Sequence, residues 1–401
     1  MKTTTSNMTL RGVWVALILA ISLSQIPMAQ AQNFQVIHNF TGGQDGAYPE
    51  AGLTLDRAGN LYGTAFAGGN SGYGTIYQLK HLGSGWTFHP LYSFAGNGDG
   101  SGPVARVVFG PDGALYGTTS SGGNGYGTVF KVQPAASACK SALCPWIEHV
   151  IYAFTGSPDD GANPGFGDFV FDASGTMYNT TVSGGTQGIG TAYAVTPSGV
   201  ESVIYNFKLN FDMTGELHPW AGLAFDANGN LYGTTIGGDM PGQSPDVFVL
   251  TQFQRGQWSE RPYCILRPNS RPVTTVVFDH AGNFYGTTSA GGGFVFESSG
   301  KCKSIQQLSG TRGPIGGSLA LDATGNLYGT TCGDGANQRG NVFELTPSNG
   351  SWIYTSLYDF TGGNDGSCPY GTVGIDANGN LYGTASAGGS QGFGTVWEIT
   401  P

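Results

Sequence analysis

The chain has 401 residues, of which 69 are glycine, 12% are aromatic and only 10% are charged. This usage, rich in turn formers and poor in Lys, Glu and Arg, predicts an all-β fold of short strands joined by tight loops. The formal net charge is −10 and the basic residues are scattered, which argues against a nucleic-acid partner.

The N-terminus has the pattern of an export signal. Basic residues, an apolar run over residues 13–23 and a small-residue sequence ending at Ala31 follow one another. The run is shorter than the roughly 20 apolar residues of a spanning helix, so it predicts a signal peptide over residues 1–31 rather than an anchor. We expect the mature chain, residues 32–401, to be a soluble monomer without a membrane span, located in the periplasm, outside the cell or on its surface.

One phrase, Gly-Asn-Leu-Tyr-Gly-Thr, returns along the chain with weaker copies between the clearest ones. Its tyrosine marks seven units, at Tyr62, Tyr116, Tyr178, Tyr232, Tyr285, Tyr328 and Tyr382. In the first unit, apolar and polar residues alternate over four segments, at residues 52–56, 60–64, 74–79 and 86–94. Four antiparallel strands per unit, named a to d, predict a seven-bladed β-propeller.

The two ends of the chain indicate how the propeller closes. Residues 34–40 resemble a strand d but precede the first unit, and the C-terminus stops after a strand c. We therefore expect the N-terminal strand to complete the last blade and to cover its open edge. The whole of residues 32–401 would be one domain.

The repeated Gly-Asn-Leu-Tyr-Gly-Thr-Thr phrase is followed by a glycine-rich phrase that runs from Gly122 to Phe130 in the second unit. In these phrases the chain resembles the GloVer tandem-repeat family of exported bacterial proteins, over essentially the whole mature chain. The resemblance implies an extracytoplasmic location. It brings no established activity and no catalytic residues.

In a propeller the b–c and d–a loops share one face, here called the upper face, and the a–b and c–d loops share the lower face. Four d–a loops repeat Asp-Gly-x-x-Pro, starting at Asp45, Asp99, Asp160 and Asp365. Asp-Gly is more typical of a turn than of a ligand, with calcium as the alternative because it prefers clustered oxygen ligands. No other cofactor and no other metal is expected.

Aromatic residues gather on the upper face, at Tyr48, Tyr73, Tyr126, Phe166, Trp220, Tyr370 and Phe393. Large rings at these positions either wedge between blades or form a stacking platform for a carbohydrate or peptide. As ligand-binding candidates we select Tyr48, Tyr126, Trp220, Tyr370 and Phe393.

Strand a should line the central channel, and its pattern predicts an inward ring of Gly52, Arg106, Asp168, Gly222, Thr275, Ser318 and Thr372. Arg106 and Asp168 fall on adjacent blades at one height, so we expect them to approach within salt-bridge distance. The pair is either a structural ion pair or a polar anchor of a binding site, with Glu50, Glu216, His218 and Trp220 on nearby loops.

Motifs for nucleophilic catalysis are missing, because the sequence has no Gly-x-Ser-x-Gly elbow and no His-x-x-x-His. The leading hypothesis is therefore a non-catalytic binding or scaffold protein for a glycan or peptide. The alternative is a carbohydrate-active or lyase-type enzyme at the channel mouth that uses Asp168, Glu216 and His218.

Six cysteines in an exported chain favour disulfides. Cys332 and Cys368 fall in upper-face loops of adjoining blades and should pair. Cys139 and Cys144 share one c–d loop and should pair locally. Cys264 and Cys302 fall at different heights on outer strands, so we expect them to be free or paired only under strain.

Overall fold

The computed structural model describes residues 32–401 except 84, 136–145, 209–217, 238–243, 255, 291–292, 299–300 and 309–316. Gln32–Pro401 forms one compact unit. Within the described residues, no helix is long and apolar enough to cross a membrane. The expected signal peptide, Glu216 and the expected Cys139–Cys144 pair lie outside these residues.

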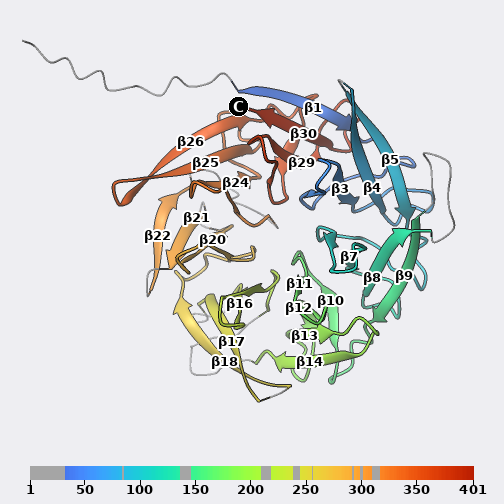
Figure 1. Ribbon diagram of the computed structural model, residues 1–401, viewed down its shortest axis with the longest axis vertical. Helices are drawn as coiled ribbons and strands as arrows, with labels where there is room; N and C mark the ends of the chain where they lie inside the picture. The colour runs from blue at the N-terminus through green and yellow to red at the C-terminus, as the bar shows by residue number, and fades with distance from the viewer. Residues whose placement is uncertain are drawn as a thin grey trace, which may run out of the picture. The chain divides into compact units, whose positions relative to one another are not determined.

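Seven antiparallel sheets surround a common centre, which confirms the seven-bladed propeller (Figure 1). The first three blades are β2 (Thr54–Leu55), β3 (Leu61–Ala65), β4 (Thr75–Leu82) and β5 (Gly85–Ser93); β6 (Val108–Phe109), β7 (Leu115–Thr119), β8 (Thr128–Pro134) and β9 (Trp146–Ala153); and β10 (Gly161–Pro164), β11 (Val170–Phe171), β12 (Met177–Gly184), β13 (Thr191–Val195) and β14 (Glu201–Asn206). The next three are β15 (Ala224–Phe225), β16 (Leu231–Thr235), β17 (Asp246–Gln254) and β18 (Gln257–Ile265); β19 (Val277–Phe278), β20 (Phe284–Thr288), β21 (Phe294–Ser298) and β22 (Cys302–Gln307); and β23 (Ala320–Leu321), β24 (Leu327–Thr331), β25 (Asn341–Ser348) and β26 (Ser351–Asp359).

The seventh blade joins the two ends of the described chain. It contains β27 (Ser367–Pro369), β28 (Gly374–Ile375), β29 (Leu381–Ala387), β30 (Thr395–Thr400) and β1 (Asn33–Asn39). β1 runs antiparallel to β30, with Phe34 opposite Ile399 and Val36 opposite Trp397. Figure 1 shows β1 beside β30 at the rim, and the predicted closure by the N-terminal strand is confirmed.

The innermost strands are shorter than the sequence predicts. β2 covers only Thr54–Leu55 instead of residues 52–56. At the upper end of this segment the blades converge, and the backbone of Gly52 lies directly against that of Thr372 in the seventh blade. The residues above the ladder therefore contact the neighbouring blade and the channel instead of extending strand a.

The a–b turns are held by their aspartates, as the repeat predicts. One oxygen of Asp56 accepts hydrogen bonds from the backbone amides of Ala58 and Asn60, and the other accepts the Tyr62 hydroxyl at 3.1 Å. Gly59 takes a φ of +80°, which L side chains rarely adopt. The turn carboxylates are therefore already occupied by local hydrogen bonds.

The second blade lacks this aspartate at its usual position, which is occupied by Gly110. Asp112 replaces it, accepting hydrogen bonds from the backbone amide of Ala114 and from the Tyr116 hydroxyl. The side chain of Lys131 donates to the same carboxylate at 2.6 Å. A shift of two positions thus preserves the chemistry of the turn.

Outer strands of neighbouring blades meet with a repeated offset. Each outer strand leads to a buried apolar residue, at Phe40, Phe94, Phe154, Phe207, Leu266, Leu308 and Phe360. These buried residues serve as reference points for the contacts between blades. The residue two positions before the reference residue of one blade contacts the residue six positions before the reference residue of the next blade. The pairs include stacked His38 and Phe88, stacked Tyr358 and Phe34, and hydrogen-bonded Tyr205 and Glu260.

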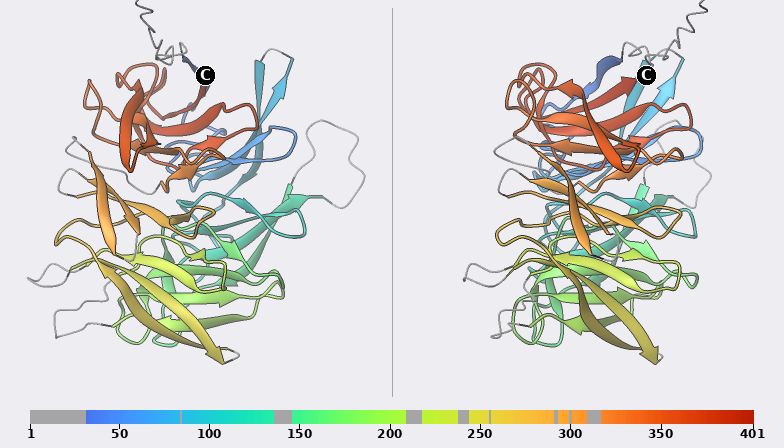
Figure 2. Two further views of the ribbon diagram at one scale, coloured as in Figure 1. Left: turned by 60° about the vertical axis from the view of Figure 1, so that its left-hand side comes forward. Right: turned by 90° about the vertical axis from the view of Figure 1, so that its left-hand side faces the viewer.

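Of the two alternatives expected for Cys264 and Cys302, this offset excludes free cysteines, because the two residues form a disulfide with Cα atoms 5.8 Å apart. They occupy the same two offset positions, on β18 and β22. Because twisted blades incline their outer strands, residues at different heights within their own blades face each other between blades (Figure 2). Cys264 and Cys302 can therefore form a disulfide because they lie at different heights on their own strands.

The second described disulfide agrees with the prediction. Cys332 and Cys368, which are 36 positions apart, are bonded with a Cα separation of 3.8 Å. Cys332 lies in the upper-face loop after β24, and Cys368 lies in the short strand β27 on the same face, at the junction of the sixth and seventh blades. The assignment of loops to faces is therefore confirmed at this position.

Candidate binding site

The predicted contact between Arg106 and Asp168 is present at the channel. The Arg106 side chain approaches one carboxylate oxygen of Asp168 through Nη2 at 2.7 Å and Nε at 2.9 Å. The Arg106 backbone amide donates to the other oxygen at 3.2 Å. The side chains remain 27% and 21% exposed, so the pair is fixed but accessible from the channel.

The remaining positions of the predicted ring carry small groups, and several of them join neighbouring blades. Gly222 packs on the backbone of Gly167 and Asp168. The backbone amide of Ser318 donates to the Thr372 hydroxyl at 2.9 Å. The ion pair is therefore the charged feature of an otherwise small and neutral ring.

One layer above the ring, three aromatic side chains converge. Phe166 and Trp220 are stacked with centroids 5.8 Å apart, and Phe166 lies 6.0 Å from Tyr370 at an interplanar angle of 39°. They come from the third, fourth and seventh blades. Because the third and seventh blades are not neighbours, this contact spans the channel. We call Phe166, Trp220 and Tyr370 the mouth cluster.

The layer follows from the sequence pattern. Four residues precede a position of the inward-facing channel ring by two residues: Trp220, Tyr370, Phe166 and Glu50. All four are half-buried, and burial raises the pKa of Glu50 above its usual value. The channel mouth therefore combines flat apolar rings with the half-buried carboxyl group of Glu50, whose pKa is raised by burial.

The other aromatic candidates lie elsewhere on the upper face. Tyr48 contacts Phe393 edge-on at 5.9 Å. The ring of Phe393 covers Gly42, and that of Tyr126 covers Gly156, in each case a glycine of the following d–a loop. Tyr48 and Tyr126 are 40% and 43% exposed, which does not fit rings that fill the space between blades.

The residues of the enzyme alternative have other partners. His218 Nδ1 lies 2.9 Å from the backbone carbonyl oxygen of Val182. Both oxygens of Asp168 accept hydrogen bonds from Arg106. A general acid or base needs a carboxyl or imidazole group directed at the substrate, and these contacts direct Asp168 and His218 toward the protein.

The Asp-Gly loops use their carboxylates locally. Asp45 accepts from Thr41, and Asp365 accepts from the Thr361 amide at 2.7 Å and from the Tyr358 hydroxyl at 3.0 Å. Among the described residues, no group of three or more His, Cys, Asp or Glu side chains is arranged to hold a metal ion. The turn interpretation accounts for these aspartates, and calcium binding stays a prediction.

The sequence analysis chose Trp220 and Tyr370 as ligand-binding candidates but not Phe166, which contacts both of them. The signal was available, because Phe166 precedes Asp168 by the same two positions by which Tyr370 precedes Thr372. An extra residue after Pro164 in the third blade shifts its spacing from the proline and obscures this alignment.

Solved structures share the fold at low sequence identity. An ulvan lyase of a new polysaccharide lyase family is 10% identical, with a TM-score of 0.51 over 88% of this chain and 94% of that one. A gluconolactonase of Xanthomonas campestris is 10% identical, with a TM-score of 0.43 over 92% and 89%. The sialidase of Trypanosoma rangeli is 11% identical, with a TM-score of 0.46 over 93% and 59%. At 10% identity, the similarity to the ulvan lyase shows the fold alone.

No curated protein matches the chain in sequence. The Gloeobacter/Verrucomicrobia repeat, by contrast, matches residues 23–238 and 264–401, which include the repeated Gly-Asn-Leu-Tyr-Gly-Thr phrases and all of the blades except the outer half of the fourth. With this match, and with the seven blades that its repeats build, the chain belongs to the Gloeobacter/Verrucomicrobia repeat family.

Proposed function

We propose that the chain is an exported, non-catalytic binding protein that holds a neutral glycan at the channel mouth of its upper face. The observation that carries this proposal is the convergence of Phe166, Trp220 and Tyr370 from three blades over one opening. Disulfides persist in oxidising compartments, so the two described bonds support export.

The chemistry of the mouth suits a sugar. The rings offer flat apolar surfaces to the apolar faces of pyranose rings, while polar groups orient the hydroxyls. The Arg106–Asp168 pair supplies donors and acceptors at a fixed height, and its two charges offset each other. A neutral ligand matches this arrangement better than a strongly charged one.

The same contacts favour binding over glycoside cleavage. Glycosidases use two carboxyl groups that flank the scissile bond. Asp168 is held by Arg106, and His218 is turned to the Val182 carbonyl oxygen. A lyase or glycosidase at this mouth would have to break these contacts before reaction.

A glycan array probed with residues 32–401 tests the proposal. We expect binding to neutral glycans and a loss of roughly tenfold or more in affinity for Trp220→Leu, since stacked rings dominate such contacts. Tyr126→Leu is the matched control, because Tyr126 covers Gly156 away from the mouth cluster and should leave binding unchanged.

Three results would reject the proposal: no glycan bound by the wild-type protein, equal losses in both variants, or cleavage of the bound glycans. Selective capture from a peptide library, without glycan binding, would assign the mouth to a peptide instead. Thermal unfolding of each variant separates a binding defect from a folding defect.

A further inference from the structure

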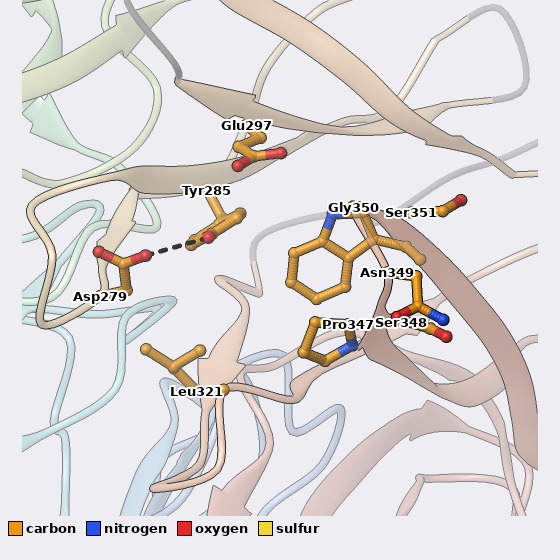
Figure 3. Close-up of a pocket in the computed structure, with 11 residues that line it drawn as sticks. Asp279, Tyr285, Glu297, Leu321, Pro347, Ser348, Asn349, Gly350 and Ser351 are labelled. Atoms are coloured by element: carbon orange, nitrogen blue, oxygen red, sulfur yellow. Dashed lines mark hydrogen bonds between the residues drawn. The ribbon is translucent and has the colours of Figure 1, made fainter.

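A pocket of about 410 Å³ opens on the lower face between the fifth and sixth blades. Figure 3 shows Tyr285 and Glu297 on one wall and the turn from Pro347 to Ser351 on the opposite wall. Trp352 also lines the pocket, and its ring meets that of Tyr285 edge-on at 5.6 Å. This volume lies in the range of small-molecule sites and accommodates one hexose.

The equivalent position between the seventh and first blades is filled by hydrogen-bonded side chains, whereas a smaller cavity of about 180 Å³ lies between the sixth and seventh blades. At the junction of the seventh and first blades, Glu398 accepts hydrogen bonds from Tyr382 at 3.1 Å and from Trp86 Nε1 at 3.2 Å. Gln35 donates to the same carboxylate. At this junction, the carboxyl group on strand c is therefore hydrogen-bonded to the tyrosine of strand b and to the tryptophan of the next blade.

The equivalent residues between the fifth and sixth blades are Tyr285, Glu297 and Trp352, and they are arranged differently. The Tyr285 hydroxyl donates to Asp279 at 3.1 Å, and Glu297 accepts no hydrogen bond from any described residue. Its register partner Lys303 is not part of the pocket lining. The Glu297 carboxylate therefore remains available to a ligand inside the pocket.

The charge of the pocket is negative. Asp279 and Glu297 line it, and none of the lining residues that the structure describes is a lysine or an arginine. Although partial burial opposes ionisation, hydrogen bonds from Asn283, Tyr285 and the Ala281 amide hold the pKa of Asp279 below its usual value. An anionic ligand would be repelled, whereas a cation would be attracted.

We propose that this lower-face pocket is a second binding site, which takes a protonated amino sugar. The ammonium group binds the Glu297 carboxylate through a charge-assisted hydrogen bond. Trp352 and Pro347 cover an apolar face of the sugar ring, and the hydroxyl and amide groups of Ser348, Asn349 and Ser351 reach its hydroxyls. The site is separate from the mouth cluster and does not depend on the function proposed for it.

Calorimetric titration of residues 32–401 with three hexoses of equal size tests the charge preference. Glucosamine carries a positive charge, glucose is neutral and glucuronate is negative. We expect glucosamine to bind at least about tenfold more tightly than glucose, and glucuronate not to bind, since one charge-assisted hydrogen bond contributes about that factor.

Two variants locate the site. Glu297→Gln should weaken glucosamine binding about tenfold and leave glucose binding unchanged. Glu344→Gln is the matched control, because Glu344 occupies the equivalent position of the next blade but accepts the Tyr328 hydroxyl at 3.0 Å. Trp220→Leu, which removes part of the mouth cluster, should leave glucosamine binding intact.

The proposal is overturned if glucosamine does not bind, if glucose or glucuronate binds as tightly, or if both glutamate variants weaken binding equally. Loss of glucosamine binding in Trp220→Leu would move the site to the upper face and also overturn it. If Glu297→Gln failed to fold, the hexose series on the wild-type protein would still decide between these outcomes.

Discussion

Two glutamates of the outer strands, Glu148 on β9 and Glu201 on β14, each face an aspartate of the preceding d–a loop. Burial and the charge of Asp99 raise the pKa of Glu148 to about 7, and burial and the charge of Asp160 do the same for Glu201. Oε1 of both glutamates is buried without a hydrogen-bond partner among the described residues. Ionisation of these carboxyl groups therefore opposes folding.

A pH-dependent stability follows for Glu148. Its pKa in the folded protein lies above the ordinary value of 4.5, so its contribution to stability is present in acid and is lost as the pH rises through about 7. Glu148→Gln, which cannot ionise, should raise the melting temperature at pH 8 and change it little near pH 4.5. Thermal unfolding at the two pH values checks this, and an equal shift at both would contradict it.

At the scale of strands and blades, the sequence predicts what the repeat encodes. The seven tyrosines of the repeated phrase predict the number of blades. Residues 34–40 identify the closing strand because they repeat the pattern of strand d. The offset between outer strands was not predictable in this way, since it depends on the twist of complete blades. For this reason the sequence left the pairing of Cys264 and Cys302 open, and the structure excludes the free alternative, while the predicted Cys332–Cys368 bond is confirmed.

Removal of β1 tests the closure of the seventh blade. A chain that begins at Gly42 lacks β1 and Phe40, whose ring is fully buried in the core shared with Leu53 and Tyr77. Loss of a buried phenylalanine ring alone costs about 3–5 kcal/mol, and the exposed edge of β30 should promote aggregation.

The measurement is thermal unfolding together with size-exclusion chromatography, with a chain that begins at Asn33 as the control. The shorter chain should melt at a lower temperature and elute partly as aggregates. Equal melting temperatures and monomeric elution of both chains would show that β1 does not hold the blade together.

At the scale of the whole molecule, the candidate site depends on contacts that no single repeat contains. Arg106 and Asp168 were predictable because adjacent blades carry them at equal height. The contact of Phe166 with Tyr370 was not, since it joins blades that are distant in sequence and meet only across the channel. The lower-face pocket was missed for a related reason, because a repeat pattern shows which positions are equivalent but not how far side chains fill each of them.

The most direct test of the central claim is a crystal structure of residues 32–401 with the tightest neutral glycan from the array. The account predicts a sugar ring in contact with Phe166, Trp220 and Tyr370, with its hydroxyls within hydrogen-bond distance of Arg106 or Asp168. A glycan bound at the lower face or on the outer strands, with the mouth cluster unchanged and uncovered, would contradict it.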